Sequence, residues 1–581
     1  MSNSPPATPH SDFGDPLPRS DGGDGTRDSF IEQDVTGTLE EHWRKGIPTL
    51  ILLLLAAFVS GYYWMLVKPG LHQRYSKIIE RNLKQLGMDG VDGLKSNSKV
   101  ESSDSELSPE KRIEILKETQ LSIRRLIGWN SADDSVHYRY GIVSQAIATG
   151  YLQEAIRSGH EAVSQYLGIA KTEQQNAVGA MERVRKLNKT FANRASLWLV
   201  KRKIDESLSM PTDDLLLLEK TVRPLMEQES IASSAKTILA QILVERALRQ
   251  SSELDLKQRL ELLTETDQLL RSVANTDSVS LSLQAEAIVL VDAEKGREIA
   301  NKALQEFWST REAQTQSVES LAAAFRCLLI IDSMKEGQVF LSEQLQQLTA
   351  MDQNKFRAAT AAAALRHVIS IAIREVAVAD GVLKSPSKAK GAIAPSNAEV
   401  MLSLAIQLAP ESPELIALLT AISKPTNNDQ IISWIKNQFA MDVTAGIENR
   451  KQPVSPENGV RPFFNAVVGL GNGALTETTL AALTSATKLS PAYGVAASRL
   501  VLHMAIADAL PTDQAIRWLQ TINFATPDVL VAWSDRASLH HKNKQPAEAI
   551  KCLEFLLEKL PGNAQITEAI EAAKMQLKIA E

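Results

Sequence analysis

The sequence of 581 residues contains few of the side chains that build metal centres, disulfide frameworks and aromatic cores. Its two cysteines, Cys327 and Cys552, are far apart, and its nine histidines form no HExxH motif and no Cys/His cluster. Aromatic residues make up only 5% of the chain. Neither a P-loop nor a G-x-S-x-G nucleophile motif occurs. We therefore expect a protein that is not an enzyme and that has no catalytic residues, no metal site and no cofactor.

Proline and β-strand patterns are also missing from the middle of the chain. No proline occurs between Pro224 and Pro386, and no stretch alternates apolar and polar residues with a sustained period of two. Segments such as SAKTILAQILVERAL instead repeat apolar residues with a period of 3.6, and a helix is expected to begin at Ser108-Pro109-Glu110 with Ser108 as its N-cap. The pattern predicts an all-α fold, an α-solenoid of antiparallel helix pairs, with a degenerate helical-repeat region over residues 108–382.

The charge is unevenly distributed. The net charge of −6 resides in residues 1–40, where eight acidic residues accompany Arg19 and Arg27. This segment is also rich in proline and glycine and poor in apolar residues, so we interpret it as a disordered acidic tail. The neutral remainder offers no broad basic surface, and we expect no nucleic-acid partner.

One uninterrupted apolar run stands out, IPTLILLLLAAFVSGYYWMLV, from Ile47 to Val67. It has no charged residue, and at 1.5 Å per residue it is long enough to cross a hydrocarbon core of about 30 Å. The acidic start of the chain argues against a cleaved signal peptide, and buried core helices rarely contain such a run. The sequence predicts a single transmembrane helix over residues 46–67 and hence a single-pass membrane protein.

Residues 68–107 are interpreted as a basic amphipathic juxtamembrane helix, Leu71–Leu86, followed by a flexible linker rich in Gly, Ser and Asp. The apolar side chains of the helix that share one face are Leu71, Tyr75, Ile78, Ile79, Leu83 and Leu86. The basic side chains on another face are Arg74, Lys77, Arg81 and Lys84. Two interpretations remain open: contact of the basic face with anionic headgroups or a partner helix, or packing of the apolar face on the rest of the protein.

A second linker is predicted over residues 383–397, and beyond it, in residues 398–581, the helical pattern becomes more regular. Near the C-terminus one set of residues follows the spacing W-x3-A-x11-A-x3-L-x7-P: Trp533, Ala537, Ala549, Leu553 and Pro561. This segment resembles a tetratricopeptide repeat (TPR). Small residues in such a repeat let two helices approach closely, large residues fill the space between them, and the proline ends the second helix.

The resemblance is incomplete. Arg536 and His540 occupy positions where the family prefers Leu and Tyr. Two weaker copies of the second-helix pattern occur earlier: Ala398, Leu402, Ala405 and Pro410, and Thr479, Leu483, Ala486 and Pro491. The resemblance implies TPR-like repeats over residues 398–581 and only a similar architecture before them.

The resemblance also implies where a partner would bind. Peptide ligands of the family often lie along the first helices of the repeats. In the last repeat the corresponding positions are Val531, Ser534, Ser538 and His541. They do not include the Lys/Asn set with which some relatives bind a peptide carboxylate, so a groove here would have another specificity.

A glycine-rich string provides a remote enzymatic alternative. Gly469, Gly471 and Ala474 satisfy G-x-G-x-x-A, as in dinucleotide-binding loops. Such a site needs a preceding strand and an acidic residue some 20 positions further on, and neither is evident. We favour a turn between paired helices.

These observations lead to three hypotheses. The first is a membrane-anchored helical-repeat scaffold that binds a protein or peptide near the bilayer, with lipid contacts through Ile47–Val67 and Leu71–Leu86. The second is an assembly factor of a membrane complex that acts through its span and juxtamembrane helix, and the third is a nucleotide-binding enzyme. The basic residues beside the span do not decide on which side of the membrane the helical body lies.

Overall fold

The computed structural model describes residues 50–86, 88, 108–157, 160–206, 212–249, 254–273, 277–311, 317–348, 350–383, 395–425, 429–439, 456–472 and 476–580. Within these ranges every regular element is a helix and there is no strand. The predicted all-α fold class is therefore confirmed for the described residues. The predicted acidic tail over residues 1–40 and most of both predicted linkers lie outside them.

The chain divides into two compact units, Met1–Lys77 and Ile78–Glu581. In the first unit, residues 50–62 are α-helical, Tyr63–Val67 form a π-helical turn, and α2 (Lys68–Gln85) begins. Large apolar side chains of residues 50–65 are exposed, from 41% for Tyr63 to 80% for Met65. The side chains of this helical segment thus have little contact with protein.

The predicted transmembrane helix is not confirmed. Across the described ranges, no helix is both long enough and apolar enough to cross a membrane. The described helical residues begin only at Leu50, the α-helix gives way to the π-helical turn at Tyr63, and the α2 helix that follows is rich in charged residues. The first residues of the predicted span, 46–49, lie outside the described part.

The predicted amphipathic pattern of α2 is confirmed. Ile79 and Leu86 are buried, whereas all four basic side chains of the predicted polar face are exposed. Within the second unit, the amide of buried Asn82 donates to Glu118 of α3 (Pro109–Trp129) across 3.1 Å. The end of α2 therefore packs on the helical body through its apolar face, as the second of the two open interpretations predicts.

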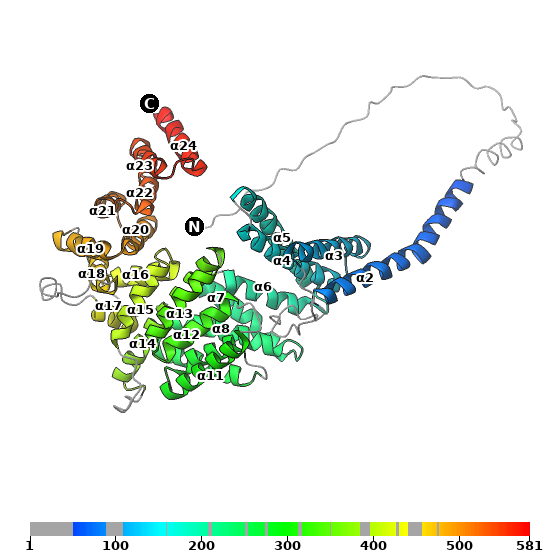
Figure 1. Ribbon diagram of the computed structural model, residues 1–581, viewed down its shortest axis with the longest axis horizontal. Coiled ribbons are helices and arrows are strands. Elements are labelled where there is room, and N and C mark those ends of the chain that lie inside the picture. The colour runs from blue at the N-terminus through cyan, green and yellow to red at the C-terminus, as the bar shows by residue number, and fades with distance from the viewer. Residues whose placement is uncertain are drawn as a thin grey trace, which may run out of the picture. The chain divides into compact units, whose positions relative to one another are not determined.

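The second unit continues from α3 as a series of helices, most of which are separated by only a few residues (Figure 1). The next helices are α4 (Asp134–Arg157), α5 (His160–Leu187), α6 (Ala192–Glu206), α7 (Thr212–Val222), η2 (Arg223–Glu227), α8 (Ala232–Leu248), α9 (Leu256–Arg271), α10 (Ser278–Ile288), α11 (Ala293–Arg311), α12 (Val318–Ile330), α13 (Met334–Gln347) and α14 (Ala350–Ala379). They are followed by α15 (Pro395–Leu408), α16 (Pro413–Ser423), α17 (Gln430–Phe439), η3 (Pro456–Gly459), α18 (Val460–Gly471), α19 (Glu477–Leu489), α20 (Pro491–Ile506), α21 (Thr512–Ala525), α22 (Leu530–Lys542), α23 (Pro546–Lys559) and α24 (Ala564–Ala580).

Local sequence signals determine where many of these helices begin. As predicted, Ser108 caps α3, and its hydroxyl accepts from the backbone N–H of Lys111 at 3.4 Å. Asp255 and Gln258 form a capping box at the start of α9. Proline lies in the first turn of α16, α20 and α23, where the helix does not need its N–H.

The helices pack in the two ways expected of a helical-repeat array. Consecutive helices form pairs, such as α4 with α5, α8 with α9, α10 with α11, α18 with α19, and α22 with α23. Alternate helices also contact one another, as α10 does with α12, α12 with α14, and α20 with α22. Each pair thus stacks on the next through one of its helices, which is the arrangement of an α-solenoid.

One hydrophobic core extends across the boundary that the sequence places at residues 383–397. It contains buried residues from Val244 in α8 to Leu539 in α22. Helix α14 packs on both α15 and α17, and α15 begins at Pro395, inside the predicted linker. The degenerate middle region and the TPR-like region therefore share one core.

Candidate functional site

The last helix pair, α22 and α23, has the packing that the repeat spacing predicts. Ala537 and Ala549 are buried at 5% and 1% exposure, which lets the two helices approach closely. The indole of Trp533 stacks on the ring of Phe555, with 4.1 Å between ring centroids. Helix α23 ends at Lys559, directly before Leu560-Pro561. This pair is TPR-like in its geometry as well as in its sequence.

The two departures from the family pattern, Arg536 and His540, interact with each other. The Nε of Arg536 donates to Nε2 of buried His540 at 3.3 Å, and the other ring nitrogen of His540 lies 2.8 Å from Oε1 of Gln545. The guanidinium also lies over the ring of Trp533, 5.6 Å from its centroid. The Leu and Tyr of the family are thus replaced by a hydrogen-bonded pair.

The structure places the four predicted partner-binding residues on two surfaces of α22. Ser534, Ser538 and His541 are exposed, and their spacing of four and three residues puts them on one helix face. The hydroxyl of Ser538 donates to the carbonyl of Ser534 at 3.0 Å. Val531 is half-buried and packs against the core. We call Ser534, Ser538 and His541 the α22 face.

A buried carboxylate fastens α22 to the preceding repeat. Asp535 is 1% exposed, and it accepts from Nη1 of Arg499 at 2.6 Å and from the hydroxyl of Ser498 at 2.7 Å, both on α20. Arg499 also donates to Glu411, before α16, at 2.9 Å. Burial raises the pKa of Asp535 to about 6, although Ser498 and Arg499 oppose the shift. These contacts fix α22, and with it the α22 face, to α20.

The glycine string lies where α18 packs closely against α16 and α19. It does not follow a strand, as the glycines of a dinucleotide-binding loop do. Gly469 and Gly471 lie in the last turn of α18, and a Cβ on Gly471 would sit 1.6 Å from the carbonyl oxygen of Ser423 in α16. A Cβ on Gly469 would meet Thr479 of α19 at 2.6 Å. Ala474 lies outside the described residues. Because a helix, not a strand, leads into the string, the context that a dinucleotide fingerprint requires is absent there.

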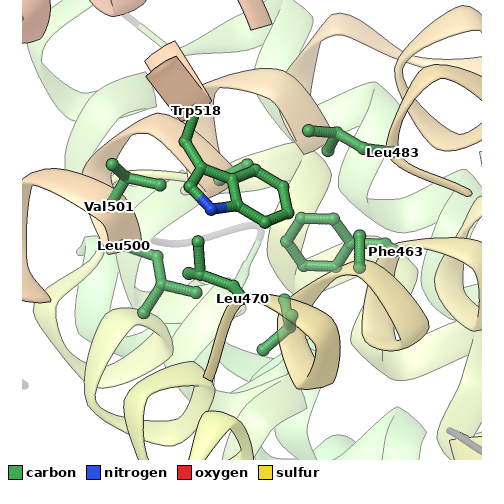
Figure 2. A pocket seen from close by; sticks show the side chains of 9 residues that line it. Phe463, Leu470, Leu483, Leu500, Val501 and Trp518 are labelled. Atoms are coloured by element: carbon green, nitrogen blue, oxygen red, sulfur yellow. The ribbon is translucent and has the colours of Figure 1, made fainter. Parts of the chain in front are cut away.

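A small cavity lies among α18, α19, α20 and α21. Figure 2 shows Trp518 above Phe463, Leu470 and Leu500, which line it together with other apolar side chains. Its volume is ≈ 10 Å³, about the space that a single water molecule needs. We interpret it as a packing void in the core.

A chain of buried charges, which none of the sequence patterns above predicts, lies in the middle of the second unit. Its members alternate in sign and come from α8, α10, α12, α14 and α16, in the order Glu414, Arg249, Glu245, Arg366, Glu286 and Arg326. Their side chains are only 6% to 16% exposed. We call this set the charge chain.

The ion pairs of the charge chain differ in the distance between the charged atoms. Arg366 lies at its centre, paired with Glu245 and, at 3.1 Å, with Glu286. Although burial opposes it, these carboxylates raise the pKa of Arg366 above its ordinary value. At one end Arg326 is 3.2 Å from Glu286, and at the other Glu414 is 3.7 Å from Arg249. The contact of Glu414 is the longest of these links.

One sequence signal could have revealed the charge chain. Glu286, Arg326 and Arg366 are each a single charged residue within an otherwise apolar helical stretch: LSLQAEAIVL, LAAAFRCLLI and AAAALRHVISIAI. A charge in such a place is buried and needs a partner. The sequence does not indicate which partner, because the two carboxylates that pair with Arg366, those of Glu286 and Glu245, lie 80 and 121 residues before it.

No group of three His, Cys, Asp or Glu residues that could hold a metal ion occurs in the part of the chain that the structure describes. Burial raises the pKa of the Cys327 thiol to about 12, and Cys552 is also buried with a raised pKa. The thiols are therefore protonated at neutral pH.

No family model matches the chain, and no curated protein matches it by sequence. Similar solved structures include the APC/C hetero-tetramer Cut9-Hcn1, with 12% identity, 80% of this chain and 84% of that chain covered, and a TM-score of 0.24. The TPR domain of P58(IPK) matches with 14% identity, 81% and 97% coverage and a TM-score of 0.18. Yeast Tom70 matches with 12% identity, 87% and 97% coverage and a TM-score of 0.22. The helix pairs themselves, rather than these superpositions, identify a helical-repeat array of TPR-like type.

Proposed function

We propose that this protein is a helical-repeat scaffold whose α22 face binds a protein or peptide partner. The observation that carries the proposal is the contrast between the two sides of α22. On one side Ala532, Asp535 and Ala537 are buried against neighbouring helices, and on the other Ser534 and Ser538 are exposed. A rigid helix that presents adjacent hydroxyl and imidazole groups is suited to hydrogen bonding with a polar segment of a partner. The proposal assigns no catalytic step and no cofactor to the chain.

Site-specific photocrosslinking tests the proposed face. A photoreactive amino acid is placed in the full-length protein at position 534, 538 or 541, one at a time. A matched control carries it at Glu554, an exposed position on α23, the second helix of the same pair. We expect the three α22 positions to give the same crosslinked species and position 554 to give none.

A second variant separates binding from folding. In Ser534→Ala/Ser538→Ala protein, two exposed hydroxyls are removed, and surface changes of this kind alter stability by roughly 0.5 kcal/mol or less. The crosslink at position 541 should weaken while the thermal unfolding temperature stays unchanged. Equal crosslinking from α23, or an unchanged crosslink in the double variant, would place the partner elsewhere.

We further propose that residues 47–67 anchor the scaffold at a membrane and that the exposed basic side chains of α2 contact anionic headgroups. The exposure of apolar residues 50–65 supports this, because such a surface in water is unfavourable by about 25 cal/mol per Å². The side of the membrane on which the helical body lies is not part of the proposal. Carbonate extraction of membranes is the test: the full chain should remain in the pellet and a chain lacking residues 47–67 should be released.

The same apolar segment favours a second candidate function, an assembly factor that acts through the segment itself. One experiment distinguishes the two candidate functions. Replacing residues 47–67 by an unrelated apolar helix preserves a scaffold that needs only an anchor, but it abolishes an assembly factor that needs specific contacts of this segment. Protease digestion of a C-terminal tag in vesicles of known sidedness then establishes the orientation.

A further inference from the structure

We propose that residues 63–70 form a hinge at which α2 turns away from the apolar helical segment, residues 50–62, and lies along an anionic membrane surface. The inference rests on the membrane anchor proposed above, and it specifies the conformation of the chain where it leaves the bilayer. The hinge and both positions used to test it belong to the first unit.

The backbone hydrogen-bond pattern changes at the start of the hinge. Residues 50–62 are α-helical, but the N–H of Lys68 donates to the carbonyl of Tyr63, five residues earlier, and Tyr63–Val67 form a π-helical turn. The α-helical pattern resumes in α2. Turns of this kind within an α-helix are rare, and they are among the few local causes of a sharp bend.

The other end of the hinge contains Pro69 and Gly70, the two residue types that are least favourable within a helix. Pro69 has no N–H to donate to the carbonyl of Met65, and its ring crowds that carbonyl. Packing does not require a glycine at position 70, because a Cβ there would meet nothing within 4 Å. The sequence therefore weakens the helix at this point, and no close contact of Gly70 accounts for it.

The residues around the hinge do not fix its angle. Tyr63 and Met65 are 41% and 80% exposed, and Pro69 and Gly70 are also exposed. A segment with so few buried contacts can change its conformation at little cost. The helix can therefore bend at residues 63–70 without disrupting the packing of these four residues.

The helix before the hinge is apolar on every side. The large side chains of residues 50–55 follow one another around the helix, and each of them is 51% to 69% exposed. A helix that is apolar all round leaves water completely only by entering the hydrocarbon of a bilayer.

The helix after the hinge has its charges on one face. The exposed basic side chains that share this face of α2 are Arg74, Lys77, Arg81 and Lys84. They extend over about 15 Å of the helix axis. They can reach anionic headgroups together only when α2 lies along the membrane surface.

One straight helix cannot meet both requirements. If residues 50–62 enter the hydrocarbon, a straight continuation directs α2 away from the membrane surface. A bend between residue 62 and Arg74 allows insertion on one side and surface contact on the other. The π-helical turn, Pro69 and Gly70 all lie in this interval.

Distances between two spin labels, measured by double electron–electron resonance in the full-length protein, test the hinge. Spin-labelled amino acids replace Leu54 and Ser76, which leaves the basic residues of α2 unchanged. The two backbone positions are about 33 Å apart in a straight helix and about 25 Å apart if the helix bends at a right angle at Pro69. We expect the shorter distance in vesicles of phosphatidylcholine with phosphatidylserine, and a smaller population of it in phosphatidylcholine alone.

Two variants locate the bend. Pro69→Ala/Gly70→Ala introduces good helix formers and should keep the distance at about 33 Å in the anionic vesicles. Gly61→Ala is the matched control, because Gly61 lies in the α-helical part of the same segment and a Cβ there would also meet nothing within 4 Å. This control should leave the shorter distance unchanged.

Carbonate extraction of the same vesicles separates the hinge from the anchor. A parent protein that is retained but keeps the longer distance would overturn the hinge and leave the anchor in place. So would a Pro69→Ala/Gly70→Ala protein that shortens as the parent does. Equal populations of the shorter distance in neutral and anionic vesicles would overturn the contact of α2 with anionic headgroups. Release of the parent by carbonate would overturn the anchor, and the hinge with it.

Discussion

Polar side chains lie in the helix interfaces of both the middle region and the last repeat, but their surroundings differ. In the middle region, α8, α10, α12, α14 and α16 converge, and six charged residues neutralise one another within their interface. In the last repeat a single carboxylate, Asp535, holds α22 to α20, and the opposite side of α22 has exposed polar residues. In the middle region other helices cover the charged residues, whereas in the last repeat the exposed side of α22 can contact a partner.

This contrast shows that the role of a polar residue in a repeat helix depends on whether another helix covers it. Where helices from distant parts of the chain cover it, the residue must be paired, because an isolated buried charge is strongly unfavourable. Where no helix covers it, the same type of residue is available to a partner.

The largest effect is expected from Arg366→Met, which removes the centre of the charge chain. Glu245 and Glu286 would lose the cation that they share in a buried interface. Breaking a buried ion pair in this way is expected to destabilise the protein by about 3–5 kcal/mol. Urea unfolding followed by circular dichroism measures the change.

The matched control for this variant is Arg461→Met. Arg461 pairs with Glu399 at 3.3 Å, but its side chain is 52% exposed, so the expected loss is only about 0–1 kcal/mol. If the Arg366 variant were no less stable than the Arg461 variant, the charge chain would not be what holds the middle region together.

Gly471→Ala tests how the TPR-like region packs where no charge is involved. The new methyl group would overlap the carbonyl oxygen of Ser423, so α16 and α18 would have to separate. We expect a destabilisation of about 3 kcal/mol by thermal unfolding. Gly179→Ala in α5 is the control, because a Cβ added there would meet nothing within 4 Å; there the change should stabilise by about 0.5–1 kcal/mol. Similar stabilities of the two variants would contradict the close approach.

Asp535→Asn should remove a pH dependence of the last repeat. The pKa of Asp535 is raised to about 6 in the folded protein, so its contribution to stability is complete below its ordinary pKa and is lost as the pH rises through about 6. Relative to the Asn variant, the parent should lose roughly 2–3 kcal/mol between about pH 4 and pH 7. Unfolding curves over this range measure the difference.

Asp508→Asn provides the comparison for Asp535. The carboxylate of Asp508 lies 3.3 Å from Lys542 and is 89% exposed. Its removal should leave the pH dependence of the parent intact. A parent and an Asp535→Asn protein with parallel pH profiles would mean that burial does not perturb Asp535.

The smallest effect concerns the two departures from the TPR pattern. Arg536→Leu alone leaves buried His540 without its hydrogen-bond donor, whereas Arg536→Leu/His540→Tyr restores both family residues. A double-mutant cycle should give a coupling energy of about 0.5–1 kcal/mol. Strictly additive effects in thermal unfolding would show that the two residues do not compensate each other.

Much of the local structure could be predicted from the sequence. The N-cap at Ser108, the helical character of the described residues between 108 and 379, the two faces of α2 and the close packing at Ala537 and Ala549 follow from short-range patterns. Such features depend on residues three to twelve positions apart, which the sequence places next to each other in a helix or a helix pair. Of the four residues predicted to bind a partner, Ser534, Ser538 and His541 are exposed and Val531 is half-buried, and their role in binding stays a prediction.

Features that depend on distant contacts could not be predicted. In the sequence, the Gly-x-Gly string resembles a turn or a nucleotide-binding loop. In the structure, the carbonyl oxygen of Ser423, almost 50 residues earlier, lies so close to Gly471 that no side chain fits there. A glycine motif alone does not tell which surface approaches it.

The amino-acid sequence alone dictates that this protein is a series of helices and where many of them begin and end, because helix periodicity, caps and prolines act within a few residues. Which charged residues meet depends on the packing of the folded chain. Arg366 finds Glu286 and Glu245 over separations of 80 and 121 residues, and the stacking of alternate helices brings them together. Because that interface is buried, each of these charges needs a charge of opposite sign beside it.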